Sequence, residues 1–275
     1  MPNLRIISDN AADRASLAAS STMAGLAVDS LLTDSDTEVH RSNGTSVTYT
    51  IAFPISEMVG GVHLPWTNLS PTASIRVRGY SDAGASAKVI DTGVIFACPA
   101  PAIRLARWEP IDAASAYAYG GGAHARAWFS NTAARVLVVD IVDVDNLQGY
   151  VEAGRIVAGK WWEPEESADY DAPLGFGSMS KQSRSDAGRL VTQIGTKYRM
   201  QSIGLSHLAT TDRKAVLDIV RANDIDVPLI FSLYPNSTDN ALERDHQMYC
   251  KFVVPASLKT PGYERYATSL EMETV

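Results

Sequence analysis

The chain has 275 residues, which is enough for two ordinary domains or one large β domain. Hydrophobic residues make up 45% and charged residues 20%, a balance typical of globular proteins and not of disordered or fibrous chains. The formal net charge of -7 argues against nucleic-acid binding as the main function. The N-terminus lacks a signal-peptide pattern and no run approaches the roughly 20 apolar residues that span a bilayer, so we predict a soluble protein made in a cytoplasm.

Strands dominate the predicted elements of the first half. A short apolar cluster at 28–32 indicates one helical turn, and apolar and polar residues then alternate over 47–53, as in a half-buried strand. A second strand over 74–80 places Arg76 and Arg78 on an outer, solvated face. The run from 135 is apolar at nearly every position, which predicts a strand in the middle of a sheet, and 149–159 predicts one more strand.

Two segments interrupt this pattern. Residues 82–125 are rich in small residues, Pro and Gly around short strand candidates at 94–97 and 103–108, and we interpret them as a long insertion. Residues 161–188 have no sustained period and are dense in Pro, Gly, Ser and acids, which indicates a linker. The predicted domains are therefore 1–160 and 189–275.

The second domain is predicted to contain an antiparallel sheet and one helix. Thr211 is a candidate N-cap, Asp212 suits the first turn, and Asn223 can end the helix. Strand patterns precede this helix over 189–208 and follow it in three further segments. Because one helix offers a single crossover, antiparallel connections are favoured, and the predicted class is mainly β. This element order is also that of tail-tube-like domains.

No spacing in the chain predicts catalysis. Asp140, Asp143 and Asp145 offer hard oxygen ligands, but alternation along a strand turns Asp140 away from the other two, so a solvated strand end is the preferred interpretation over a calcium site. Acidic residues at 163, 165 and 166 suggest acid–base work beside two tryptophans, and an acidic loop is the commoner explanation. The five histidines have no metal-ligand spacing, namely His40, His63, His124, His207 and His246.

The cysteines and glycines of the chain do not indicate a disulfide framework or a cofactor site. Cys98 and Cys250 lie far apart in different surroundings, which predicts two buried free thiols and not a disulfide framework. The glycines near 175 lack the pattern of a phosphate-binding loop. We therefore predict no enzyme activity and no catalytic, cofactor-binding or metal-binding residues.

The adjacent tryptophans Trp161 and Trp162 raise a separate question. Neighbouring side chains of an extended chain point in opposite directions, so one can enter the core while the other covers a neighbouring subunit. The alternative is that both fold back on their own sandwich. The sequence leaves both open.

The first half resembles the galactose-binding, discoidin-like β-sandwich in the run from Leu17 to Phe53 and its continuation through Asp82. In that family a small-residue strand is followed by a turn of helix, a loop and a strand with a charged outer face. The resemblance implies an N-terminal jelly-roll or discoidin-like sandwich. The chain departs from the family at His40, where Trp is frequent.

The run NLQGYVEAGRIVAGKWWEP resembles tail-tip proteins, which are distal tail or baseplate structural proteins, of long-tailed bacteriophages and gene transfer agents. The matching residues are Asn146, Gly149, Tyr150, Gly154, Arg155 and Gly159. The resemblance implies a virion protein assembled in the host bacterial cytoplasm, a ring or trimer of identical copies, and contacts with other tail proteins.

The predicted function is accordingly that of an oligomeric adaptor that links the distal tail to hub or fibre proteins. The alternative is a carbohydrate-binding module that contacts host glycans. In that alternative the stacking aromatics are Trp66, Trp108, Trp128 or Tyr119. A glycosidase that uses Glu163 and Glu165 is the least favoured hypothesis. Neither nucleic-acid binding nor membrane insertion is expected.

Overall fold

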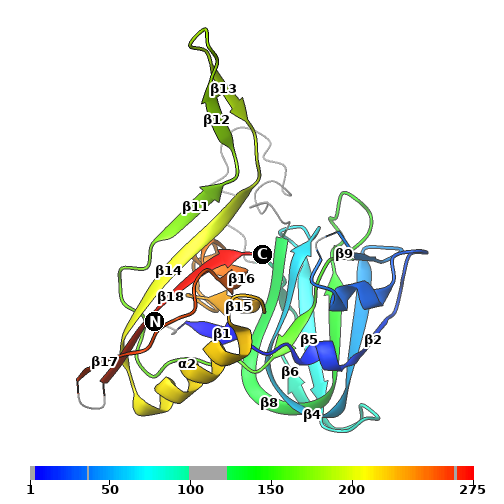
Figure 1. Ribbon diagram of the computed structural model, residues 1–275. Coiled ribbons are helices and arrows are strands. Elements are labelled where there is room, and N and C mark those ends of the chain that lie inside the picture. Colours follow the sequence, from blue (N-terminus) through cyan, green and yellow to red (C-terminus); the bar gives the residue numbers. More distant parts are fainter. Residues whose placement is uncertain (1–3, 36, 99–122, 263–264) are drawn as a thin grey trace. The chain divides into compact units, whose positions relative to one another are not determined.

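The structure is a computed structural model that describes residues 4–35, 37–98, 123–262 and 265–275, and it divides the chain into two compact units. The first unit holds residues up to 163 together with 229–248, and the second holds 164–228 and 249–275. Figure 1 labels most of the strands and helix α2. Among the described residues, no helix has the length and apolar character needed to cross a membrane.

The first unit is built on a nine-stranded antiparallel sheet in the order β3-β9-β4-β8-β5-β6, with β2 and β10 also paired to β4 and β7 to β5. Its elements are β1 (Arg5–Ile7), η1 (Ala11–Arg14), β2 (Ser16–Ala19), η2 (Val28–Leu32), β3 (His40–Arg41), β4 (Ser46–Thr67), β5 (Ser74–Tyr80), β6 (Lys88–Asp91), β7 (Ile95–Phe96), β8 (Ala123–Val142), β9 (Glu152–Ala153), β10 (Val157–Gly159), β15 (Leu229–Ser232) and α3 (Asn240–Asp245).

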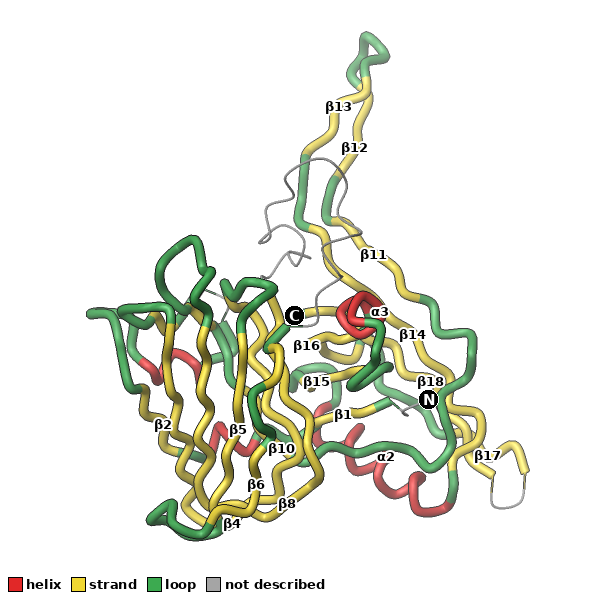
Figure 2. Tube along the Cα trace, turned by 180° about the vertical axis from the view of Figure 1, so that it is seen from behind, coloured by secondary structure: helices red, strands yellow, loops and turns green. Residues whose placement is uncertain are grey.

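The long strands β4 and β8 pair along nearly their whole length and bend together, so that their halves lie in two layers. The first half of β4 pairs with β2 and its second half with β10, and the register with β8 shifts between Ala52 and Glu57. Pro54 lies within this shift, where a missing N–H does not break the ladder. Figure 2 shows the two strands curving at the lower edge of the view. The predicted mainly β, sandwich-type class is confirmed.

The space between the layers is filled by the side chains that the alternating pattern predicted. Val47, Tyr49, Ile51 and Phe53 are buried, whereas the intervening residues of β4 are half-buried. The predicted central strand over 135–142 is the second half of β8, which pairs with β4 on one side and β5 on the other. The core cluster also contains Val62, Leu64, Val77, Leu137, Val139, Val151 and Ile156.

The predicted strand over 149–159 is instead two short strands, β9 and β10. The interruption surrounds Arg155, whose buried guanidinium pairs with Asp13 at 2.8 Å and with Asp34 at 3.6 Å. At the interruption, the N–H of Gly154 donates to Trp66 and that of Ile156 to Leu31, outside any ladder. The two strands are thus separated at the residue whose side chain forms these ion pairs.

The second unit contains a sheet in which β14 pairs with both β11 and β18, and β18 also pairs with β16 and β17. β12 and β13 form a two-stranded sheet of their own. β16 starts in the first unit and ends in the second. The elements are β11 (Leu174–Ser178), β12 (Lys181–Arg184), β13 (Leu190–Gln193), β14 (Lys197–Leu208), α2 (Thr210–Asn223), β16 (Gln247–Phe252), β17 (Lys259–Gly262) and β18 (Arg265–Thr274).

One segment is grouped differently from the predicted domains, and two others contain strands. Residues 229–248 group with the first unit, where β15 pairs with β1. The segment 161–188, expected as a linker, contains β11 and β12. The expected insertion over 82–125 contains β6, the start of β8 and β7, which matches the strand candidate at 94–97. Its central part, including the strand candidate at 103–108, lies outside the described residues.

The helix predictions need two corrections. Helix α2 is present and ends at Asn223, but its N-cap is Ala209, with no side-chain capping bond, and not Thr211. A second helix, α3, was not predicted. It is only six residues long and starts where Asp239 accepts hydrogen bonds from the N–H groups of Ala241 and Leu242. So short a helix has too few turns to show a period in the sequence.

Candidate functional site

The three aspartates of the predicted strand end accept hydrogen bonds from different residues. Asp140 accepts hydrogen bonds from Arg78 at 2.6 Å and from Thr48 at 2.9 Å. Asp143 is buried and accepts from the Ser70 N–H at 2.8 Å, and the exposed Asp145 accepts from Thr72 at 2.7 Å. Within the described ranges, no group of three or more His, Cys, Asp or Glu residues is arranged to hold a metal ion.

The acidic residues after the tryptophans do not form a catalytic pair in the first unit. Glu163 is ion-paired with Arg5 at 2.9 Å. In the second unit Glu165 and Glu166 are exposed, and the Glu165 backbone N–H donates to Asp212 at 3.0 Å. Glu163 and Glu165 therefore have separate structural contacts and belong to different units.

Trp161 is held by contacts within its own unit. Its indole N–H donates to the Phe129 carbonyl at 2.7 Å, its backbone N–H donates to Asn131, and the Arg5 guanidinium lies 4.2 Å from its ring centre. The backbone of Trp162 forms an isolated bridge with Ile6. Both tryptophans are half-buried. The contacts of Trp161 are those expected if it closes its own sandwich.

Two of the five histidines are buried in the first unit with polar partners. His40 lies 3.0 Å from the Tyr49 hydroxyl and 3.2 Å from the Thr22 hydroxyl. His63 lies 3.2 Å from His124 and edge-on against Trp128. Burial lowers the pKa of His40, and burial with the nearby His124 and Arg126 holds the pKa of His63 well below its ordinary value. Both are therefore neutral at pH 7.

Both cysteines are buried free thiols, as predicted. Burial raises the pKa of the Cys98 thiol to about 12 and also raises that of Cys250. A thiol that stays protonated at pH 7 is a poor nucleophile. These residues therefore contribute packing and not chemistry.

The end of the sandwich where β4 begins, β8 ends and β5 begins carries a group of polar loops. The pairing of Ser46 with Val142, and of Val142 with Ser74, places these three strand ends side by side. We call residues 68–73, 143–152 and Arg41 the loop platform. Figure 1 shows the platform loops near the label of β9.

Polar contacts hold the two loops of the platform together. Asp143 accepts bonds from both the N–H and the hydroxyl of Ser70, and from the Asn146 amide at 3.1 Å. The Asn68 amide donates to Gln148 at 2.8 Å and to the Tyr150 carbonyl at 2.9 Å, and it accepts from the Glu152 N–H. Because each loop supplies donors and acceptors to the other, the platform is fixed before any ligand arrives.

Tyr150 is the aromatic centre of the platform. The Arg41 guanidinium lies 4.2 Å from the centre of its ring, and Arg41 also donates to Glu152 at 2.8 Å. Gly149 has a φ of 76°, a left-handed backbone conformation that glycine adopts without steric cost, and it lies in the turn just before Tyr150. The side chains of Val144, Leu147 and Gln148 beside it are exposed. An aromatic ring with planar polar groups and a few apolar side chains suits a ligand with many hydroxyls.

The sequence predicted some of these residues but not their grouping. Asn146, Gly149 and Tyr150 belong to the motif from which the tail-tip resemblance was drawn, whereas Arg41 and Asn68 had no signal because they come from distant segments. Among the expected sugar-stacking aromatics, Trp128 is buried beside His63 and Trp66 packs over Gly154. Trp108 and Tyr119 lie outside the described residues.

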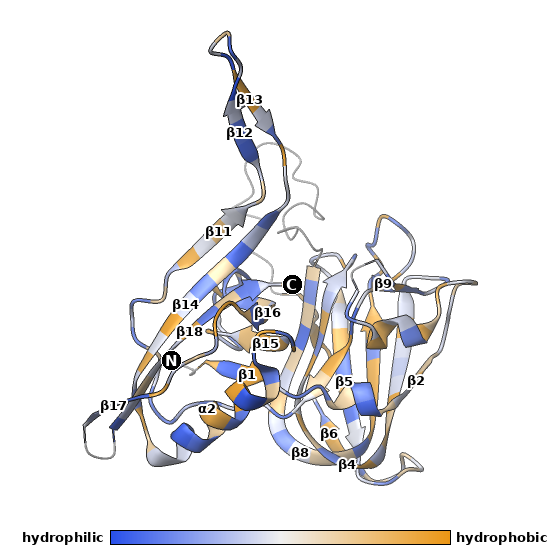
Figure 3. Ribbon diagram, viewed as in Figure 1, coloured by the Kyte–Doolittle hydropathy of each residue, from blue (hydrophilic) through white to orange (hydrophobic). Residues whose placement is uncertain are grey.

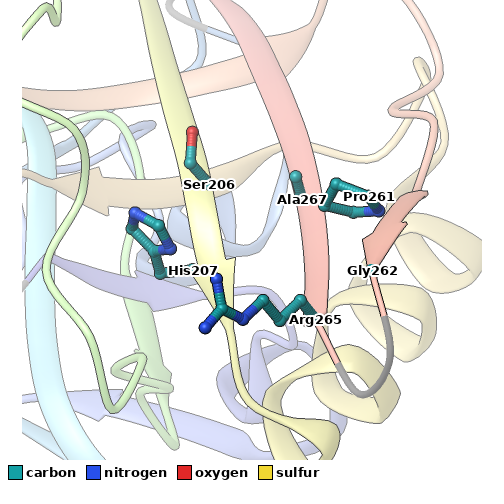
Figure 4. Close-up of a pocket in the computed structure, with 6 residues that line it drawn as sticks. All are labelled: Ser206, His207, Pro261, Gly262, Arg265 and Ala267. Atoms are coloured by element: carbon teal, nitrogen blue, oxygen red, sulfur yellow. The ribbon is translucent and has the colours of Figure 1, made fainter.

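The second unit has an open hollow of about 610 Å³ between β14, β17 and β18. Figure 4 shows Arg265 reaching from β18 toward His207 on β14. The Ser206 hydroxyl donates to Asp169 at 2.6 Å. A serine nucleophile needs a histidine base within hydrogen-bond reach. The hydroxyl proton of Ser206 is instead donated to the Asp169 carboxylate. The hollow is lined by Ser206, His207, Pro261, Gly262, Arg265 and Ala267.

Comparison with known proteins finds similarity to solved structures but not to family models or curated proteins. No protein-family model matches the chain, and no curated protein matches it. Chitosan-binding module 1 from a chitosanase/glucanase of Paenibacillus sp. IK-5 is 15% identical, with a TM-score of 0.40, over 55% of this chain and 99% of that chain.

Two further solved structures are similar at the same level. CBM32-3 from a family 31 glycoside hydrolase of Clostridium perfringens is 13% identical, with a TM-score of 0.40, over 55% of this chain and 94% of that one. The lectin domain of lectinolysin, solved with Lewis B antigen, is 15% identical, with a TM-score of 0.38, over 55% of this chain and 96% of its own.

Proposed function

We propose that this protein is a non-catalytic binding protein that recognises a carbohydrate with the loop platform of its sandwich. The observation that carries the proposal is the stacking of Arg41 on Tyr150 beside the fixed amides of Asn68 and Gln148. Planar donors and acceptors match sugar hydroxyls, and the face of an aromatic ring offers an apolar contact to the carbon–hydrogen face of a sugar. The preformed platform reduces the ordering cost of binding.

The test is a glycan array followed by calorimetric titration of the best-bound sugar. We expect saturable binding by the full chain. Gln148→Ala and Tyr150→Ala are each expected to weaken binding by about tenfold or more, since each removes a direct contact. The control is Arg265→Ala, a similar truncation of an exposed residue in the hollow of the second unit. The proposal fails if no sugar binds saturably, or if Tyr150→Ala binds like the unmodified protein.

A second candidate function is assembly: an oligomeric adaptor in a bacteriophage tail tip or baseplate that links the distal tail to hub or fibre proteins. It is supported by the resemblance of the run from Asn146 to Pro164 and by the apolar side chains exposed in the second unit. Carbohydrate binding is compatible with this role if the tip contacts host glycans. Negative-stain imaging tests it: rings or trimers of the purified chain support assembly, and single particles contradict it.

A further inference from the structure

One antiparallel ribbon of the second unit is continuous over residues 174–201, and we call it the arm. β11 pairs with the start of β14 over Leu174–Ser178, and β12 pairs with β13 beyond it. Figure 1 shows β12 and β13 continuing past the end of β11. The tip is a turn in which the Ser185 N–H donates to Arg189 at 2.9 Å and Gly188 has a φ of 75°.

The arm has a defined shape although water surrounds it. The Tyr198 ring covers Gly177, where an added Cβ would lie 2.3 Å from the ring. An added Cβ on Gly195 would lie 2.5 Å from the Met179 backbone, and the Met179 N–H donates to Thr196 at 2.9 Å. The close approach at Gly195 is to backbone, so that position needs glycine, whereas at Gly177 the Tyr198 side chain would have to move. The ribbon is therefore built as an ordered element.

Large apolar side chains are exposed along the arm. Ile194 is 90% exposed, and every residue of β12 and β13 is exposed. A two-stranded ribbon without a covered face is marginally stable in water, and exposed apolar groups of this kind mark interaction surfaces. Figure 3 shows hydrophobic segments between hydrophilic ones along the ribbon. The exposed apolar residues are Phe176, Met179, Leu190, Val191, Ile194 and Met200.

The charge of the arm is opposite to that of the rest of the chain. The arm contains five basic residues and one acidic residue, within a chain whose formal net charge is -7. The remaining residues must therefore carry a larger negative charge than the whole chain. A basic, apolar element on an acidic protein is complementary to the body of another copy. The basic residues are Lys181, Arg184, Arg189, Lys197 and Arg199, and the acidic one is Asp186.

An exposed acidic stretch, opposite in charge to the arm, lies just before the arm in the sequence. Glu165, Glu166 and Asp171 are exposed, and Tyr170 among them is exposed over its whole side chain. The stretch thus offers both carboxylates and an aromatic ring to a basic, apolar partner. Because arm and stretch are different surfaces of one chain, their union joins copies head to tail, which closes into a ring when the rotation allows.

We propose that the arm of one copy docks on the acidic stretch over 165–171 of a second copy of this chain. This inference rests on the second proposed function, assembly, and it is independent of sugar binding. The apolar residues of the arm lie against Tyr170, and its basic residues face the carboxylates. Salt weakens such a contact because the charges are at the surface.

The test measures the mass of the full chain by native mass spectrometry and sedimentation over a range of concentrations. We expect oligomers for the unmodified protein. Lys181→Glu with Arg189→Glu, or Glu165→Lys with Glu166→Lys, is expected to raise the dissociation constant by about tenfold or more. Mixing the two double variants restores opposite charges wherever the two variants alternate, and is expected to restore association between them. The matched control is Lys214→Glu with Arg221→Glu on α2, an equal change of charge that leaves the oligomer intact.

The outcomes distinguish the assembly function from the contact between the arm and the acidic stretch. If the unmodified protein is oligomeric and neither double variant changes its mass, assembly stands and the arm contact is wrong. A monomer at every concentration overturns both. If the arm variants instead lose binding to a short DNA duplex while the mass of the protein is unchanged, the occupant is a polyanion and the self-docking proposal is wrong. Circular dichroism confirms that each variant is folded.

Discussion

The β4–β8 pair of the sandwich and the β12–β13 pair of the arm are both antiparallel ladders, yet their side chains have opposite surroundings. Tyr49 and Ile51 of β4 have no exposed surface, and neither have Leu137 and Val139 of β8. Every residue of β12 and β13 is exposed. Both ladders are antiparallel, so we expect the sandwich ladder to be more stable than the arm ladder because its side chains are covered.

The comparison shows how one chain can combine a self-sufficient core with a segment that needs a partner. The sandwich covers its own strands with a second layer, because β4 and β8 bend back over themselves. The arm has a shape but lacks a second layer among the described residues. Substitutions in the two regions should therefore have very different effects.

The largest expected effect is the loss of the buried ion pair that ties α3 to β8. Glu243 is completely buried and pairs with Arg126 at 2.8 Å. Glu243→Ala leaves a buried guanidinium with less compensation, and we expect a loss of about 3 to 5 kcal/mol in the free energy of unfolding, measured by urea denaturation. The exposed pair of Arg221 with Asp218 is the control, and Asp218→Ala is expected to change stability by about 0.5 kcal/mol or less.

The next effect is truncation in the core. Leu137→Ala removes a completely buried side chain from β8, and we expect a loss of about 2 to 5 kcal/mol from lost burial and the cavity left behind. Leu190→Ala in the arm is the matched control, because the same side chain is 52% exposed there and the expected loss is about 0.5 kcal/mol or less. Equal losses at the two positions would contradict the contrast drawn between core and arm.

A smaller effect is expected from pH. Burial lowers the pKa of His63, so the unfolded chain binds a proton near pH 6.5 that the folded chain does not. Stability therefore rises with pH through this range and falls as pH drops below about 6.5, by up to about 1.4 kcal/mol per pH unit for one histidine. His40 contributes in the same direction. Denaturation midpoints at pH 5.5 and 7.5 measure this.

The control for the pH effect removes the titrating group. His63→Gln keeps a polar side chain that cannot gain a proton, and we expect a smaller difference between the two midpoints than in the unmodified protein. His207→Gln, an exposed position in the second unit, should leave the difference unchanged. An unmodified protein that is more stable at pH 5.5 than at pH 7.5 would contradict the lowered pKa values of these histidines.

The alternating strands were the most predictable part of this protein. The period of two over 47–53 and the apolar run from 135 identified β4 and β8, because a side chain facing the core must be apolar wherever it occurs. The helical turn at η2 and the end of α2 were predicted on similar local grounds. The polar platform was not, since the contacts of Arg41 and Asn68 join segments about a hundred residues apart.

The sequence by itself determined that the chain is mainly β and which residues face a core, since the hydrophobic period records the side of the strand that leaves water. The tertiary structure decided the rest. It bent β4 and β8 into two layers, divided 149–159 around the buried Arg155, grouped 229–248 with the first unit and gathered the loop platform. These features depend on long-range pairing of polar and charged groups, whose partners leave no periodic mark in the chain.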